Sequence, residues 1–92
     1  MKRYLIERDI PGIGSMSSAQ LKDIAAISNG ALAKLAGKVQ WLQSLIAAEK
    51  TFCIYLAGSE DLVRENSRLA GFPVTRVTEV ARVLDPMTPH TT

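Results

Sequence analysis

The alternation of hydrophobic and polar positions predicts four β-strands. Residues 2–10 alternate branched or aromatic side chains with charged ones, which is typical of a strand. Residues 39–47 and 51–57 are two further β-rich runs, and the short segment 48–50 between them indicates an antiparallel hairpin. Residues 74–84 predict the last strand.

The first helix is expected to begin at Ser17. Ser17 and Gln20 have the spacing of a capping box, in which the serine oxygen accepts a hydrogen bond from the third helical amide. Gly37 is expected to end the helix. Between these limits an apolar stripe recurs at helical spacing, made of Leu21, Ile24, Ala25, Leu32 and Leu35.

A second helix is expected between Ser59 and Gly71. Ser59 is a favourable N-cap, and Glu60 and Asp61 bring two carboxylates to the positive end of the helix dipole. Gly71 followed by Pro73 is a typical helix end.

The resulting order of elements predicts an α+β domain of ferredoxin-like βαββαβ type. Right-handed crossovers place both helices on one face of a four-stranded antiparallel sheet. The other face stays open, so its apolar side chains must be covered by a second copy, by a ligand or by curling of the sheet. We expect a single domain over residues 1–86 and a flexible tail over residues 87–92.

Strand alternation assigns the strand side chains to the two faces of this sheet. The side chains expected to face the helices are Tyr4, Ile6, Leu42, Ile46, Phe52, Ile54 and Leu56. Those expected on the open face are Leu5, Glu7, Trp41, Gln43, Leu45, Cys53 and Tyr55.

The predicted open face therefore combines polar or reactive groups with apolar cover, which is the composition of a ligand site. The candidate ligand-binding residues are Glu7, Trp41, Gln43 and Tyr55. Three of them have a simpler interpretation: Glu7 as a solvated strand residue, and Trp41 and Tyr55 as core or interface residues, whereas Gln43 by itself indicates nothing. A cysteine such as Cys53 is more often a small buried hydrophobic residue than a ligand.

Composition narrows the function classes. The 92-residue chain is 47% hydrophobic and has one cysteine, so no intrachain disulfide can form and a cytoplasmic location is expected. A scattered net charge of +2 indicates no nucleic-acid partner, and no run reaches the roughly 18 apolar residues of a membrane span. The single histidine, His90, lies in the predicted tail, so a zinc site of the usual spacing cannot be built.

A family resemblance rests on four segments: residues 4–12 (YLIERDIPG), 50–57 (KTFCIYLA), 70–73 (AGFP) and 83–86 (VLDP). They resemble a family of small bacterial proteins that carries a "domain of unknown function" label and includes nickel-binding members. The resemblance implies a ferredoxin-like fold, usually dimeric, and suggests that a divalent metal such as nickel is bound.

The chain departs from this family at two positions that bear on the metal. Relatives commonly carry a histidine after the tryptophan of the second strand and another in the second helix, whereas this chain has Gln43 and Asn66. Both changes remove an imidazole, the group best suited to nickel. Glu7 and Cys53 remain as the candidate metal donors.

Three functions are open at this point. The first is a dimeric binding protein that holds a metal ion or small ligand on the open sheet face, and we favour it over an enzyme. The second is a cofactor-free enzyme of the oxygenase or isomerase kind, with Glu7, Cys53 and Tyr55 as the available acid or base groups. The third is a scaffold that binds another protein.

Overall fold

Four strands form one antiparallel sheet in the computed structural model, which describes residues 1–87. The sheet order is β2-β3-β1-β4. The strand bounds are β1 Lys2–Asp9, β2 Val39–Ile46, β3 Lys50–Ala57 and β4 Arg76–Val80. The last strand is shorter than predicted, because regular pairing with β1 ends at Val80 opposite Arg3. Of the predicted tail, residues 88–92 lie outside the described residues.

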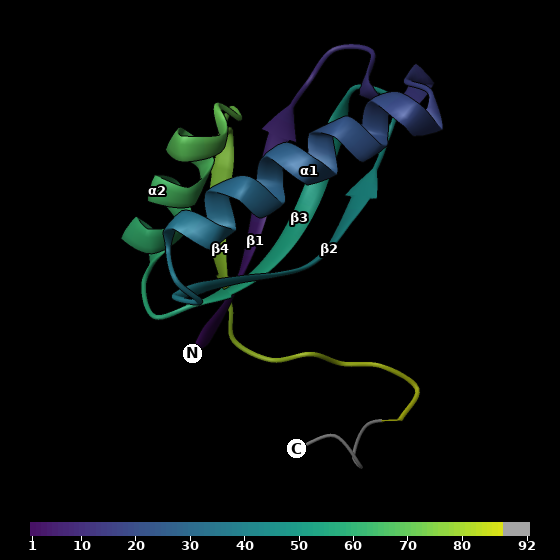
Figure 1. The fold of residues 1–92 in the computed structure, drawn as a ribbon. Coiled ribbons are helices and arrows are strands. Elements are labelled where there is room, and N and C mark those ends of the chain that lie inside the picture. Colours follow the sequence, from purple (N-terminus) through teal and green to yellow (C-terminus); the bar gives the residue numbers. More distant parts are fainter. Residues whose placement is uncertain (88–92) are drawn as a thin grey trace.

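Both helices, α1 (Ser18–Lys34) and α2 (Glu60–Ala70), lie on the same face of the sheet, with α1 crossing the strands obliquely (Figure 1). This confirms the ferredoxin-like α+β fold. A short 3-10 helix, η1 (Ile13–Ser15), precedes α1 and was not predicted. In the described chain, neither helix combines the length and the apolar content needed to cross a bilayer.

The predicted start of α1 and both predicted ends of α2 are confirmed, whereas α1 ends at Lys34, before the predicted Gly37. Ser17 Oγ accepts the Gln20 amide at 3.1 Å, and the Gln20 side-chain oxygen accepts the Ser17 amide at 2.9 Å, which completes the capping box. Ser59 caps α2 through the Leu62 amide at 3.4 Å. Gly71 ends α2 with a φ of 76°, a left-handed conformation that glycine adopts without strain.

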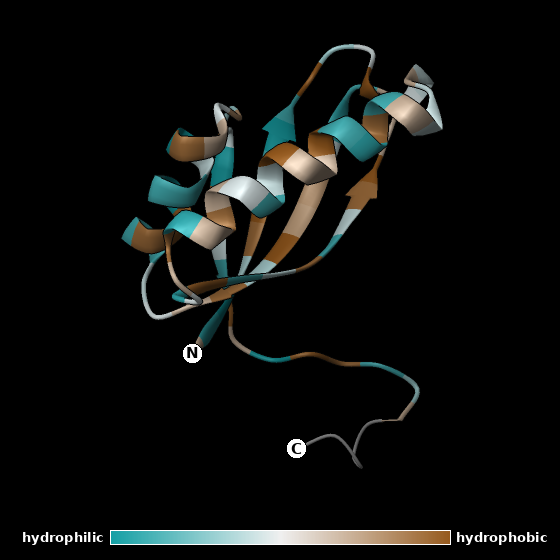
Figure 2. Ribbon diagram, in the orientation of Figure 1, coloured by the Kyte–Doolittle hydropathy of each residue, from teal (hydrophilic) through white to brown (hydrophobic). Residues whose placement is uncertain are grey.

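The core lies between the helices and the sheet, where the strands behind α1 are largely hydrophobic (Figure 2). Leu32 and Leu35, from the predicted stripe of α1, pack against this core. Its buried members are Tyr4, Ile6, Val39, Cys53, Tyr55, Ala57 and Val63.

The predicted faces of β3 were wrong. Tyr55 pairs with Tyr4 and Cys53 pairs with Ile6, so both share the helix-facing side of β1. The three side chains predicted to face the helices instead lie on the open face: Phe52, Ile54 and Leu56. Both alternating sets of this strand are apolar, so alternation alone does not distinguish them.

On β2 the prediction failed at a β-bulge. The register shifts between Trp41, which pairs with Tyr55, and Gln43, which pairs with Ile54. Trp41 therefore faces the helices rather than the open side, and Leu42 falls in the bulge with 45% of its surface exposed. After the bulge Gln43 lies on the open face, as predicted.

Candidate functional site

A cavity of about 380 Å³ lies between α1 and the helix-facing side of the sheet. Helix α1 contributes Leu21, Ile24, Ala25 and Ser28 to its walls. The strands contribute Arg8, Trp41, Ser44, Ile46, Thr51, Cys53 and Tyr55. The remaining walls come from the loops that follow β1 and α2, among them Ile13, Phe72 and Pro73. The walls are mainly apolar, with a few polar groups among them.

A chain of hydrogen bonds runs along the strand side of the cavity. Trp41 Nε1 donates to Ser44 Oγ at 3.0 Å, and Ser44 Oγ donates to Cys53 Sγ at 2.9 Å. Thr51 Oγ1 lies 3.5 Å from the same sulfur. Cys53 is 5% exposed, so the thiol is a buried group held by two hydroxyls.

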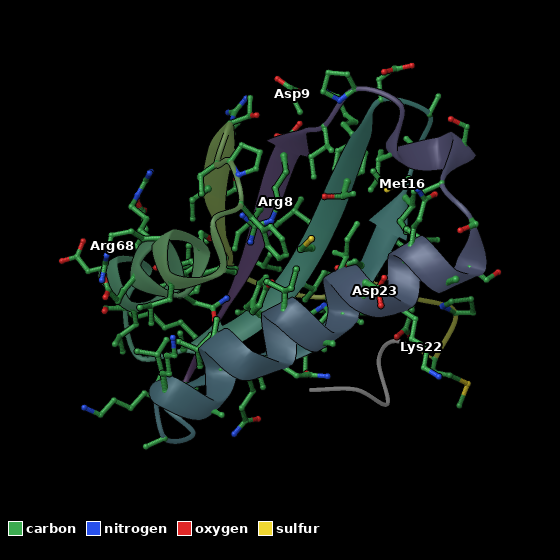
Figure 3. All side chains as sticks on the ribbon, turned by 45° about the horizontal axis from the view of Figure 1, so that its top comes forward. Arg8, Asp9, Met16, Lys22, Asp23 and Arg68 are labelled. Carbon is green, nitrogen blue, oxygen red and sulfur yellow. The ribbon has the colours of Figure 1, made fainter. Side chains whose placement is uncertain are left out.

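Arg8 brings a positive charge into the interior. Its side chain extends from β1 into the space between sheet and helices (Figure 3) and is 1% exposed. Nη1 donates to the Pro73 carbonyl at 2.8 Å, and Nη2 donates to the Tyr55 hydroxyl at 3.4 Å. The guanidinium carbon lies 5.9 Å from the Tyr55 ring centroid and 5.5 Å from that of Phe72, within the range of cation–π interaction.

Sequence reasoning missed Arg8, although a signal was present. Arg8 follows Tyr4 and Ile6 at the two-residue period of β1, and those two side chains were correctly assigned to the helix-facing side. A charged residue at the next position of that buried row is unusual, because arginine is almost never fully buried without a partner.

Three polar side chains of the interior have groups with no hydrogen-bond partner among residues 1–87. These are Arg8 at Nε, Ser28 at Oγ and Asn66 at both amide atoms. Arg8 and Ser28 line the cavity, whereas Asn66 is fully buried in α2 and does not. Buried polar groups are normally paired, so these exceptions need an explanation.

The structure divides the predicted site residues between two places. Trp41, Cys53 and Tyr55 line the cavity. Glu7 and Gln43 lie on the opposite, open face, where Glu7 is paired with Lys50 at 3.9 Å. The expected single surface was therefore wrong, because the β3 residues point to the helix side.

This arrangement does not fit a nickel site built within one described chain. Glu7 and Cys53, the predicted donors, lie on opposite faces of the sheet. Residues 1–87 contain no group of three His, Cys, Asp or Glu side chains that could hold a metal ion. Gln43 and Asn66 are also on different sides, since α2 packs on the helix-facing side. His90 lies outside the described residues.

Fold and cavity together define a small ferredoxin-like α+β protein with a partly open cavity of about 380 Å³ under its first helix. Residues 4–80 match the family described as "Nickel responsive protein SCO4226-like", and the chain belongs to this family, which confirms the resemblance inferred from the sequence. The structure is similar to the crystal structure of SCO4226 from Streptomyces coelicolor A3(2), with a TM-score of 0.73. That match covers 89% of this chain and 99% of the other at 16% identity, so it shows a shared fold. No curated protein sequence matches the chain significantly.

Proposed function

We propose that the protein is a small homodimeric binding protein whose ligand occupies the cavity beneath α1. The observation that carries this proposal is the cavity itself: about 380 Å³, with apolar walls and a few converging polar groups. Small-molecule sites typically have volumes of about 300–1,000 Å³ and this kind of lining. Trp41 and Tyr55, two of the sequence-predicted ligand residues, belong to the walls.

Binding is favoured over catalysis by the chemistry of the walls. General acid–base catalysis uses a histidine or carboxylate most often. No Asp, Glu or His is among the residues lining the described cavity, whose titratable groups are Arg8, Cys53 and Tyr55. A cytoplasmic location would keep the Cys53 thiol reduced.

The test uses Trp41, the only tryptophan of the chain, as an internal reporter. Titration with octanamide, a neutral amphipathic probe, should change its fluorescence. Ala25 lines the cavity and its neighbour Ala26 is exposed, so Ala25→Leu should weaken binding by filling the space while Ala26→Leu leaves it unchanged. Binding that is equally strong in both variants would contradict a ligand site in this cavity. Native mass spectrometry of the freshly purified protein would identify a co-purifying small molecule.

The homodimer would form through the open face of the sheet. Neither helix covers this face (Figure 1), which carries Leu5, Phe52, Ile54 and Leu56 on the two central strands. Contiguous apolar surface of this kind favours association. The same face holds the cations of Arg3 and Arg76 as well as the anion of Glu7, so a second copy related by a two-fold axis can offer opposite charges.

Light scattering should give twice the chain mass of 10.0 kDa. Ile54→Asp places a charge at the centre of the open face and should give monomers, because a desolvated carboxylate opposes association. Ile27, 51% exposed on α1, provides the control, and Ile27→Asp should stay dimeric. A dimeric Ile54→Asp protein, or a monomeric parent, would exclude this interface.

Nickel is the second candidate ligand, and family membership supports it. Because Glu7 and Cys53 face opposite sides, a nickel ion bound by this protein would take donors from two copies. Gln43→His adds an imidazole on the open face and should raise nickel affinity about tenfold, or roughly 1.4 kcal/mol. Asn66→His, buried in α2, should add less. Calorimetric titration of the parent and of both variants with nickel is the test, and no binding by any of them would reject nickel as a ligand.

A further inference from the structure

We propose that the cavity selects an amphipathic monoanion, with a carboxylate head on Arg8 and an apolar body beneath α1. This inference rests on the proposed small-molecule function and specifies the class of ligand. Its starting point is the burial of Arg8, a cationic residue that is 1% exposed.

The charge of Arg8 has no counterion in the described chain. None of the ion pairs among residues 1–87 includes Arg8. On its own strand, Glu7 and Asp9 belong to the opposite face, where both pair with Lys50. On α1, Asp23 is exposed. Burying an unpaired charge destabilises the folded state, and an anionic ligand would offset this loss of free energy.

The guanidinium also has donors available. It presents five N–H groups, and two hydrogen bonds are formed, to Pro73 and Tyr55. Nε has no partner among the described residues. These two bonds and the Tyr55 and Phe72 rings hold the guanidinium in place. A carboxylate can accept two parallel N–H bonds from such a fixed guanidinium.

The rest of the cavity determines the form of the ligand. Arg8 is the one charged residue in the described lining, which matches a single negative charge rather than the double charge of a phosphate monoester. Leu21, Ile24 and Ala25 of α1 provide an apolar wall for a hydrocarbon body. Ser28 of the same wall is 3% exposed, and its Oγ has no hydrogen-bond partner among the described residues.

The test compares three probes of equal chain length: octanoate, octanamide and octylamine. In calorimetric titrations of the parent protein, octanoate should bind at least tenfold more tightly than octanamide, and octylamine most weakly. Arg8→Met, which keeps an unbranched side chain without the charge, should abolish the preference for octanoate. The control is Arg82→Met, at an exposed position after β4, which should retain it.

The outcomes distinguish the preference for an anion from the binding function itself. If octanoate and octanamide bind the parent equally, the anion preference is wrong while the binding function stands; if none of the probes binds, the binding function fails first. A second measurement needs no variant: in the ¹⁵N-labelled parent, the Arg8 Nε–H resonance should shift with octanoate and not with octanamide. An unchanged resonance at saturating octanoate would overturn the proposal even if Arg8→Met does not fold.

Discussion

Gly14 lies where η1 packs against the loop between β2 and β3, and its replacement by alanine tests this contact. An added Cβ would come within 2.7 Å of both the Ala47 carbonyl oxygen and the Ala48 Cα, and within 3.2 Å of the Ala47 carbonyl carbon. All three are backbone atoms, so a side-chain rotation cannot relieve the clash. The loop and η1 must separate, which threatens the hydrogen bond from the Gly14 amide to the Ala48 carbonyl at 3.0 Å.

The expected loss of stability in Gly14→Ala follows from these contacts. Overpacking typically costs about 1–3 kcal/mol, and loss of one backbone hydrogen bond costs about 1 kcal/mol. We expect Gly14→Ala to lower the free energy of unfolding by about 2 kcal/mol, which corresponds to a fall in Tm of about 8–16 °C for a domain of this size. Because Ile13 is buried in the cavity wall beside Gly14, affinity for cavity ligands should fall as well.

Gly30 is the matched control for this substitution. It lies in the middle of α1 with nothing within 4 Å of an added Cβ. Gly30→Ala should therefore raise the free energy of unfolding by about 0.8–1.0 kcal/mol, through helix propensity alone. Urea unfolding followed by far-ultraviolet circular dichroism measures both variants. Equal midpoints for Gly14→Ala and the parent would refute the close approach of η1 to the hairpin loop.

Three further predictions concern the helices. Ser17→Ala removes the cap of α1 and should cost about 1 kcal/mol of stability in the same assay, a loss that Ser17→Asn should largely avoid. Asn66→Leu replaces a fully buried amide that has no partner among residues 1–87, and should raise the Tm; a lower Tm would mean that the amide is paired in solution. Hydrogen bonds from Arg68 hold the pKa of the Glu65 carboxyl below its ordinary value of 4.5. The small contribution of this pair to stability is therefore present at neutral pH and is lost as the pH falls through the lowered pKa. In an NMR titration Arg68→Gln should move the Glu65 midpoint upward, and an unchanged midpoint would show that the pair does not persist in solution.

The elements and their order were predictable because their signals are local. The capping box at Ser17, the N-cap at Ser59 and the left-handed end at Gly71 each involve residues within one helical turn, and all three are present in the structure. The β1 assignment also held, with Tyr4 and Ile6 buried toward the helices. Since right-handed crossovers leave few arrangements for this order of elements, the sequence also determined the topology.

The composition of the candidate site depended on tertiary structure. Both faces of β3 are apolar, so only its pairing with β1 decides that Cys53 and Tyr55 face the helices. The bulge that turns Trp41 to the same side arises from the pairing of β2 with β3. The cavity is lined by residues of α1, of the strands and of the loops after β1 and α2, which lie far apart in the chain. The sequence contained Arg8 in the buried row of β1, but only the positions of the neighbouring elements showed that no residue among 1–87 is its counterion.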